Sequence, residues 1–176
     1  ALVIDTTNPT ICSLSLTDGA KGVSATANLV LTFDAAVVVG TGNITIKLGS
    51  DNSTIEAIAV GSGQVTGTGT AIITIDPSVT LGSSTAYYVQ VDATAFDDVA
   101  GNSYAGIANT TSWNFTTTDT TAPTITNVSS DKANGSYTTG EVIDIDVTFS
   151  EAVTSTGNVT VTLETGTTDR TCTFTV

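Results

Sequence analysis

The chain contains two copies of one sequence unit. Three segments recur at an offset of 114 to 116 residues: 5–11 as 119–125, 32–37 as 148–153, and 42–46 as 157–161. An offset of this size is the length of a small domain and far longer than a solenoid repeat. The repeat predicts a complete domain at 5–118 and a partial one at 119–176. Residues 1–4 align with the end of the last strand of the first domain, which predicts the end of a preceding strand or a linker.

Apolar residues alternate with Thr, Ser and Gly throughout the chain, and we find no stretch of helical periodicity. In the first repeat the pattern predicts strands near 12–16, 29–33, 44–48, 54–60, 70–76, 86–92 and 112–118. Turn sequences rich in Gly, Asp and Asn separate them. Seven short strands at this spacing predict an all-β fold of tandem immunoglobulin-like β-sandwiches, the second incomplete.

The second repeat supplies strands A to D and then ends. Ile143, Ile145, Val147 and Phe149 form its predicted strand B, and Cys172, Phe174 and Val176 its strand D. Half a sandwich leaves an inner face and a strand edge exposed. Two explanations stay open: a longer parent protein, or completion by strands of a neighbouring molecule.

Three residue types sharpen this prediction. Tyr87 has the spacing of a tyrosine corner, whose hydroxyl bonds to nearby backbone, although Tyr88 could face inward instead. Trp113 is the only tryptophan, and we expect it in the core. Cys12 and Cys172 occupy different positions in the two repeats, which favours two buried thiols over a disulfide. A disulfide between molecules is the other interpretation.

The charge balance restricts the partners. The formal net charge is −13, with four basic residues and 12% charged residues in total. No basic patch can therefore neutralise phosphates, so we exclude nucleic acid and docking on an anionic membrane. No apolar run reaches the ~18–20 residues of a membrane span, so we exclude membrane insertion. A cation fits the acidic balance better.

Seven of the ten asparagines begin an Asn-x-Ser/Thr sequon, where about three would arise by chance in so Ser- and Thr-rich a chain. This excess favours an extracellular, glycosylated surface. The glycosylation candidates are Asn43, Asn52, Asn109, Asn114, Asn127, Asn134 and Asn158.

Several of these segments carry a family resemblance. The Asp-Thr-Thr-x-Pro-Thr linkers, the Phe-Ser-Glu-Ala-Val stretch at 149–153, the segment at 95–102 and Trp113-Asn-Phe-Thr-Thr117 resemble bacterial Ig-like repeats. Such repeats occur in S-layer proteins and large surface adhesins. The resemblance implies a secreted, multidomain protein of the cell surface, with Ca²⁺ often stiffening its domain junctions. Repeat one departs from the pattern, because Ala35 replaces the acid and Asp34 lies one position earlier.

Acidic residues are expected to gather at the two poles of the first domain. At one pole, the start of strand A and the B–C and F–G loops of an Ig-type sandwich bring together Asp5, Asp34, Asp97, Asp98 and Asn102. Ca²⁺ takes six to eight oxygen ligands of this kind. The alternative is that these are solvated turn residues, which Asp and Asn favour in any case.

A second cation site is predicted at the junction of the repeats. Asp119 and Glu151 would meet the trailing pole of the first domain, where we expect Asp18 and Asp76. A cation there would fix the angle between domains. Chelation is then expected to raise flexibility at 117–123 and to lower the melting temperature.

Enzymatic function is not expected. The chain has no histidine, so a Ser-His-Asp triad and an imidazole base are excluded. The glycine-rich segments at 61–63 and 67–69 lack the Lys of a phosphate-binding loop. We predict a structural module of an extracellular surface protein or filament, whose partners are neighbouring Ig-like domains or copies of itself. The alternative is an adhesion module whose Asp-rich loops bind a glycan or host protein, for which Tyr104 and Tyr137 are the aromatic candidates.

Overall fold

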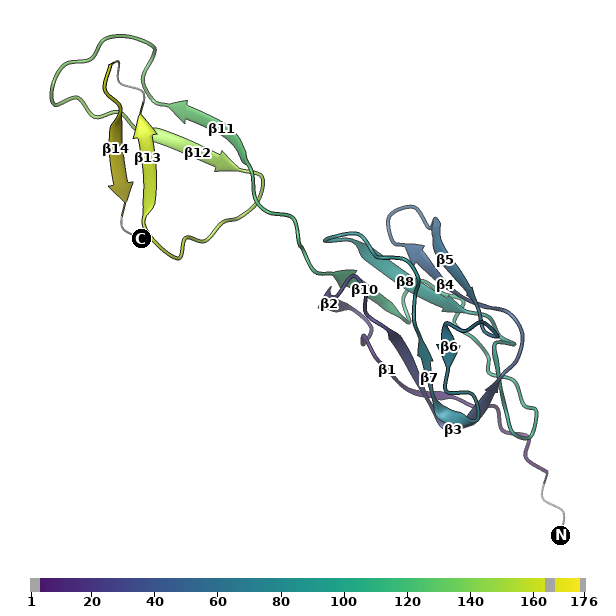
Figure 1. The fold of residues 1–176 in the computed structure, drawn as a ribbon. Helices are drawn as coiled ribbons and strands as arrows, with labels where there is room; N and C mark the ends of the chain where they lie inside the picture. The colour runs from purple at the N-terminus through teal and green to yellow at the C-terminus, as the bar shows by residue number, and fades with distance from the viewer. Residues whose placement is uncertain (1–3, 164–166, 175–176) are drawn as a thin grey trace. The chain divides into compact units, whose positions relative to one another are not determined.

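The computed structural model describes residues 4–163 and 167–174, and it divides the chain into two compact units, Ala1–Thr120 and Thr121–Val176. The regular secondary structure in these described ranges consists of β-strands (Figure 1). Among them there is consequently no helix long and apolar enough to cross a membrane. Of the predicted strand end at 1–4, residues 1–3 lie outside the described residues. Ile4 is exposed and has no regular structure.

The first unit is a sandwich of two sheets. One sheet has the order β1 (Ile11–Leu14), β3 (Leu29–Val39), β7 (Thr70–Ile75), β6 (Val65–Thr66), and β9 (Phe96–Asp98) also pairs with β3. The other has the order β2 (Ala20–Val23), β10 (Asn114–Thr117), β8 (Ala86–Val91), β4 (Asn43–Leu48), β5 (Thr54–Ala59). Strands β2 and β10 are parallel, and the other pairs are antiparallel. This arrangement confirms the predicted all-β, immunoglobulin-like sandwich.

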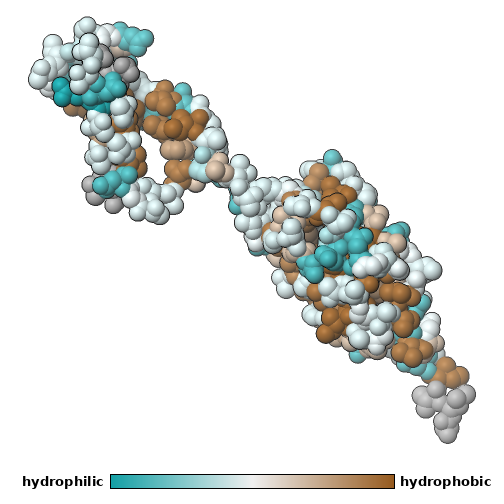
Figure 2. Space-filling view, viewed as in Figure 1, coloured by the Kyte–Doolittle hydropathy of each residue, from teal (hydrophilic) through white to brown (hydrophobic). Residues whose placement is uncertain are grey.

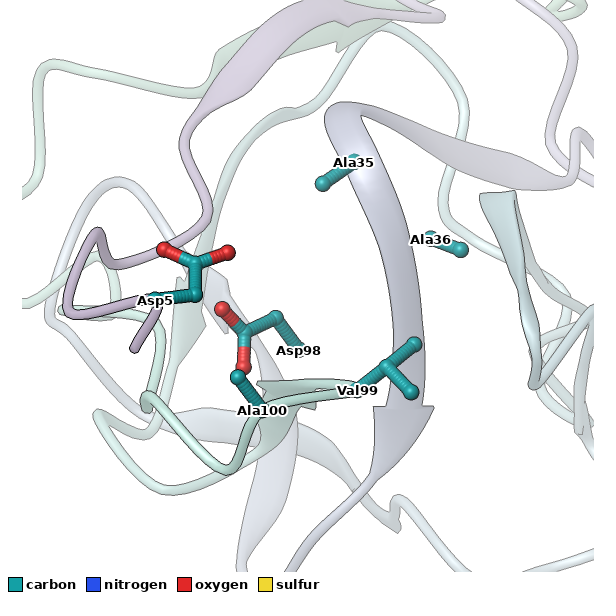
Figure 3. Close-up of a pocket in the computed structure, with 6 residues that line it drawn as sticks. All are labelled: Asp5, Ala35, Ala36, Asp98, Val99 and Ala100. Carbon is teal, nitrogen blue, oxygen red and sulfur yellow. The ribbon is translucent and has the colours of Figure 1, made fainter. Parts of the chain in front are cut away.

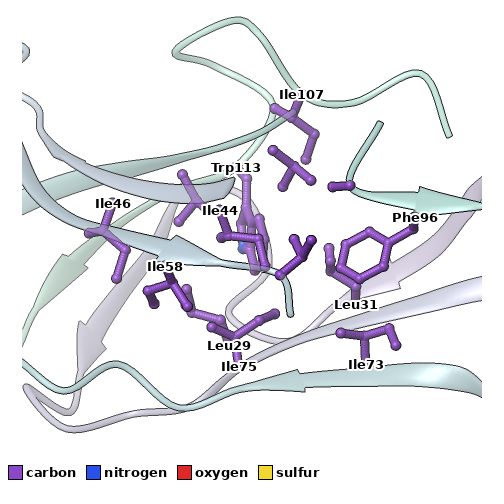
Figure 4. Close-up of a cluster of buried hydrophobic side chains, with 14 of the residues drawn as sticks. Leu29, Leu31, Ile44, Ile46, Ile58, Ile73, Ile75, Phe96, Ile107 and Trp113 are labelled. Carbon is purple, nitrogen blue, oxygen red and sulfur yellow. The ribbon is translucent and has the colours of Figure 1, made fainter. Parts of the chain in front are cut away.

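The core lies between the two sheets, because alternate residues of each strand point inward. Leu31 on β3 pairs with Ile73 on β7, and Ile46 on β4 pairs with Val89 on β8. All four side chains are fully buried. Trp113 is also fully buried beside them (Figure 4), and its Nε1 donates to the Leu16 carbonyl at 3.0 Å. The predicted core position of the indole is confirmed.

The predicted tyrosine corner is also confirmed. The Tyr87 hydroxyl accepts a hydrogen bond of 2.8 Å from the Gly82 backbone N–H, while the ring is buried and packs at 5.8 Å from Phe115. Tyr88 on the opposite side of the strand is buried as well. Its hydroxyl donates to Asn52 Oδ1 at 3.0 Å. Both tyrosines thus bury an apolar ring and pair a polar end.

The prediction that Cys12 is buried is wrong, because a register shift interrupts the alternation of β1. The pairing of β1 with β3 is irregular between Ile11 and Ser13. As a result Ile11 and Leu14 turn toward the core, whereas Cys12 and Ser13 are both exposed. One extra residue in a strand reverses the faces of the residues that follow it. Cys172 is exposed too, and both cysteines are free thiols.

Three short strands of the first unit were not predicted. Strands β2, β6 and β9 have at most four residues each, and apolar residues do not recur at every second position along them, as they do in the segments around β1 and β10. The strand predicted at 54–60 is present as β5, which pairs with β4. The two-residue strand β6 pairs with β7.

The second unit contains two separate strand pairs in the residues that the structure describes. These are β11 (Ile125–Ser130) with β12 (Ile145–Phe149), and β13 (Val159–Leu163) with β14 (Arg170–Phe174). Ile143 precedes β12, and Val176, predicted on the last strand, lies outside the described residues. Because β14 pairs with β13, it takes the place of β5 in the first unit, not that of strand D in the opposite sheet.

The predicted exposure of the inner face of the second repeat is confirmed. Alternate apolar residues of β12 remain well exposed, although their equivalents in the first unit are buried. Each described sheet of this unit has two strands. No described strand of the unit pairs with the free edge of β12 or with that of β13.

Candidate functional site

A shallow hollow lies at one pole of the first unit, where the leading linker passes the end of β9. Asp5 of the linker and Asp98 of β9 face this hollow (Figure 3). Small and apolar side chains form the rest of its wall: Ala35, Ala36, Val99 and Ala100. The predicted approach of the linker, the B–C segment and the F–G segment to one another is therefore present for these residues.

Asn102 holds the Asp98 carboxylate in place. Its backbone N–H donates to Asp98 Oδ1 and its Nδ2 to Oδ2, both at 2.8 Å. These bonds from the side chain and backbone of Asn102 lower the pKa of Asp98, since they favour the charged form. Asn102 Nδ2 also lies 3.3 Å from the Asp5 carbonyl oxygen, so one amide joins the linker to the end of β9.

Asp34 and Asp97 are engaged elsewhere. Asp34 accepts from the Thr10 backbone N–H at 2.8 Å and from the Thr10 hydroxyl at 2.7 Å, which lowers its pKa. This pair fastens the start of β1 to β3. Asp97 points to the other side of β9 from Asp98, as alternation requires, and accepts from the Ser103 hydroxyl at 2.5 Å.

The structure therefore brings Asp5 and Asp98 together at one hollow, whereas Asp34 and Asp97 bind other residues. Among residues 4–163 and 167–174, no three acidic or cysteine side chains are close enough to form a metal-binding group. A Ca²⁺ ion needs six to eight oxygens, so backbone carbonyls and water would have to supply most of the ligands around Asp5 and Asp98. The Ca²⁺ site stays a prediction.

The acids of the predicted junction site belong to different units. Asp119 lies just beyond β10, where it accepts from the Ser83 hydroxyl at 3.1 Å. Asp18, expected near it, instead accepts from the backbone and side chain of Asn114 at the start of β10, at 3.0 and 2.6 Å. Asn114 and Asp119 are five residues apart, which corresponds to roughly 16 Å in extended chain. Glu151 is an exposed residue of the second unit, and its meeting with Asp119 stays a prediction.

The sequon asparagines differ in how far their side chains are used. Asn109 forms a local turn, in which its Oδ1 accepts from the Thr111 and Ser112 N–H groups. Asn114 donates to Asp18, and Asn52 accepts from Tyr88. The remaining candidates have exposed side chains: Asn43, Asn127, Asn134 and Asn158. Glycosylation stays a prediction at all seven.

Sequence reasoning missed one carboxylate that joins the two sheets. Glu56 on β5 accepts from the Ser78 hydroxyl at 2.6 Å and from Gln64 Nε2 at 2.9 Å. Burial raises the pKa of Glu56, but these bonds outweigh it and the net shift is downward. A single acid at the third position of a strand gives no signal of its partners, which lie 8 and 22 residues away.

One candidate for ligand binding is withdrawn. Tyr104 is buried and its ring packs edge-on at 5.2 Å against Phe33, so burial raises its pKa to about 12. It serves the core and offers no exposed aromatic surface. Tyr137, in the second unit, is partly exposed.

The first unit has the fold of an immunoglobulin-type module. Its described residues contain no recognisable catalytic arrangement. Comparison with known proteins agrees on the class: the family profile described as a bacterial Ig-like domain matches residues 5–117. The chain belongs to that family. A search of curated proteins found no match.

Proposed function

We propose that the chain is a structural, non-catalytic module of an extracellular surface protein or filament. It would supply length and rigidity through β domains packed in tandem or between molecules. The family match, the low proportion of charged residues and the excess of sequons support a location outside the cytoplasm. The main support for the proposal is the position of the two ends of the polypeptide in the first unit.

The two chain ends of the first unit lie at opposite poles (Figure 1). The leading linker passes Asp98, whereas the segment after β10 lies beside Ser83 and Val23. Tension applied to the ends therefore runs along the strands.

Parallel pairing of β2 with β10 suits this direction of force. The Gly19 N–H donates to the Asn114 carbonyl and the Thr118 N–H to the Val23 carbonyl, both at 2.8 Å. When the first of two parallel strands is pulled backward and the second forward, their hydrogen bonds are loaded together and cannot open one at a time. Such a contact raises the barrier to forced unfolding, which governs the lifetime of a tethered domain.

Force spectroscopy on the intact chain, tethered at both ends, tests the proposal. We expect one cooperative unfolding event for the first unit. Thr118→Pro removes the donor to Val23 and should lower the unfolding force. Thr118→Ala keeps that donor and is the matched control. Gradual extension of the unaltered chain without a distinct event would contradict a role in bearing tension.

Ca²⁺ is part of this proposal as a stiffening ion at the pole of Asp5 and Asp98. Bound Ca²⁺ stabilises the folded state by mass action, so the melting temperature should rise with Ca²⁺ and fall with EGTA. Asp98→Asn should abolish the difference, and Asp146→Asn in the second unit should preserve it. Identical melting curves in Ca²⁺ and EGTA would rule out the ion.

A further inference from the structure

The first unit contains an Asp-Pro peptide bond at the point where the chain leaves one sheet for the other. Asp76 follows directly after β7, and Pro77 begins the segment that leads to β8 in the opposite sheet. No other aspartate of the sequence precedes a proline. This bond is chemically unusual, because the aspartate side chain can reach its own carbonyl carbon and the proline nitrogen leaves as a secondary amine.

Gln64 donates a hydrogen bond to the carbonyl oxygen of this peptide bond. Its Nε2 lies 3.1 Å from the Asp76 carbonyl oxygen, and its own carbonyl oxygen accepts from the Asp76 backbone N–H at 2.8 Å. The second contact extends the pairing of β6 with β7 by one residue. A donor held on a carbonyl oxygen stabilises the negative charge that this oxygen carries after a nucleophile attacks the carbonyl carbon.

Glu56 holds both Gln64 and the chain on the far side of the bond. Its Oε1 accepts from Gln64 Nε2 at 2.9 Å and from the Ser78 hydroxyl at 2.6 Å. The Ser78 backbone N–H also lies 3.1 Å from Glu56 Oε2. The bond between Asp76 and Pro77 is therefore fixed on both sides by one acid and one amide, and Glu56 acts as a positioning residue for Gln64.

The Asp76 carboxylate is available as a nucleophile. The side chain is exposed, and within the described residues its carboxylate oxygens accept no hydrogen bond. Asp34 and Asp98 differ, because each of their carboxylates accepts two hydrogen bonds. Rotation of the Asp76 side chain alone brings an oxygen to the carbonyl carbon, so no other group has to move.

We propose that the first unit cleaves its own chain between Asp76 and Pro77. A carboxylate oxygen of Asp76 attacks the carbonyl carbon of the same residue, and the negative charge passes to the carbonyl oxygen beside Gln64. When the carbonyl reforms, the carbon–nitrogen bond breaks. The electron pair goes to the Pro77 nitrogen, which takes a proton from the solvent, and Asp76 is left as a cyclic anhydride.

Water completes the reaction by opening the anhydride. Asp76 then ends the first fragment with two carboxyl groups, and Pro77 begins the second fragment with a secondary amine. One water molecule is consumed for each bond broken. Each molecule reacts once and does not turn over, so the reaction is compatible with a structural module that is not an enzyme.

The two fragments remain associated after the cut. Strand β8 of the second fragment pairs with β4 of the first, and β10 pairs with β2. Separation would expose buried side chains such as Leu31 and Phe115, whereas the surface of the intact unit in Figure 2 mixes hydrophilic and hydrophobic residues. Exposure of apolar surface to water opposes separation.

The cleavage goes beyond the proposed function, since it requires no tension and no neighbouring domain. It changes how the first unit would respond to force, a consequence that rests on the proposed function. A cleaved unit transmits tension only through contacts between its fragments. Forced unfolding would then detach the two ends from each other, where the uncut chain would lengthen and stay connected.

Mass spectrometry of the denatured chain, after prolonged incubation at about pH 5, tests the cleavage above the range in which acid weakens the unit. We expect two fragments that end at Asp76 and begin at Pro77, with masses that add to the mass of the chain plus one water. Incubation in concentrated urea should slow cleavage on the order of 100-fold, because Gln64 is then no longer held on the carbonyl. Absence of fragments, or an equal rate in urea, would overturn the inference.

Variants identify the groups that take part. Asp76→Asn should abolish cleavage, and Gln64→Met should slow it on the order of 100-fold. Gln90→Met removes a similar donor, to the Ala108 carbonyl, and is the matched control that should leave the rate unchanged. Trp113 fluorescence checks that each variant is folded, and the comparison in urea needs no variant.

Two further measurements separate the alternatives. The rate should not depend on protein concentration, because the reaction lies within one chain. A rate that rises with concentration would indicate cleavage of one molecule by another and overturn the inference. Force spectroscopy of Asp76→Asn, which stays uncut, decides the tension-bearing role independently of the cleavage.

Discussion

The two units carry the same alternating pattern but use it differently. In the first, the inward residues of β3 and β4 are sealed by β7, β8 and Trp113. In the second, the equivalent residues of β12 and β13 border an open cleft. Alternation therefore specifies which face of a strand is apolar, whereas burial requires partner strands on the same sheet. A unit with half of the strands of a sandwich therefore keeps the alternation of apolar and polar residues but does not form a closed core.

The largest expected effect separates the two units at equivalent positions. Leu31→Ala should lower the free energy of unfolding of the first unit by about 2–5 kcal/mol, because it leaves a cavity in a closed core. Val147→Ala should leave that unit unchanged. Urea denaturation followed by Trp113 fluorescence measures the first unit alone, since the indole is buried there. A shift of the Trp113 transition by Val147→Ala would contradict the independence of the two units.

A smaller effect is expected at the tyrosine corner, which has no counterpart in the described part of the second unit. Tyr87→Phe removes the acceptor of the Gly82 N–H and should cost about 1 kcal/mol in the same denaturation experiment. Tyr88→Phe is the matched control. It should cost less than about 0.5 kcal/mol, because the exposed Asn52 can bind water instead. Equal losses would remove the special role of Tyr87.

Acid should weaken the first unit through its hydrogen-bonded carboxylates. The folded-state pKa of Glu56 lies below its ordinary value of 4.5, and that of Asp98 lies below 3.8. Their stabilisation is therefore fully present above these ordinary values and is lost as the pH falls through the folded pKa. At pH values under about 4.5, we expect the melting temperature of the first unit to decrease as the pH is lowered.

Glu56→Gln tests the contribution of that carboxylate. The variant keeps the size of the side chain but does not ionise, so the decline of the melting temperature with acid should be shallower. Glu141→Gln, in the second unit, is the control and should leave the pH profile of Trp113 fluorescence unchanged. A profile of Glu56→Gln identical to that of the unaltered chain would show that Glu56 does not contribute.

The smallest effect concerns the cysteine that alternation misplaced. Because Cys12 is exposed on β1, Cys12→Ser should change the unfolding free energy by no more than about 0.5 kcal/mol. In the native chain its thiol should react readily with Ellman's reagent. Strong protection of Cys12 in the folded protein would mean that the register shift at Ile11 and Ser13 is absent.

The candidate site could be predicted only in part. The loops that meet at one pole follow from the type of sandwich, and Asp5 and Asp98 do face one hollow there. Their hydrogen-bond partners did not follow from the sequence. Asp34 binds Thr10, and Asp97 and Asp98 point to opposite sides of β9, a strand too short to recognise. Partners far apart in the chain are chosen by packing, which no local pattern records.

The sequence by itself determined the number of units, the positions of the long strands and the identity of their apolar faces. These properties are local, because the side-chain period of a strand is set by its backbone. Only the tertiary structure decided the register shift in β1, the burial of Tyr104 and the parallel contact of β2 with β10. It also decided that one apolar face is covered and the other is open. Each of these depends on contacts between segments distant in sequence, whose free energy exists only once the sheets have formed.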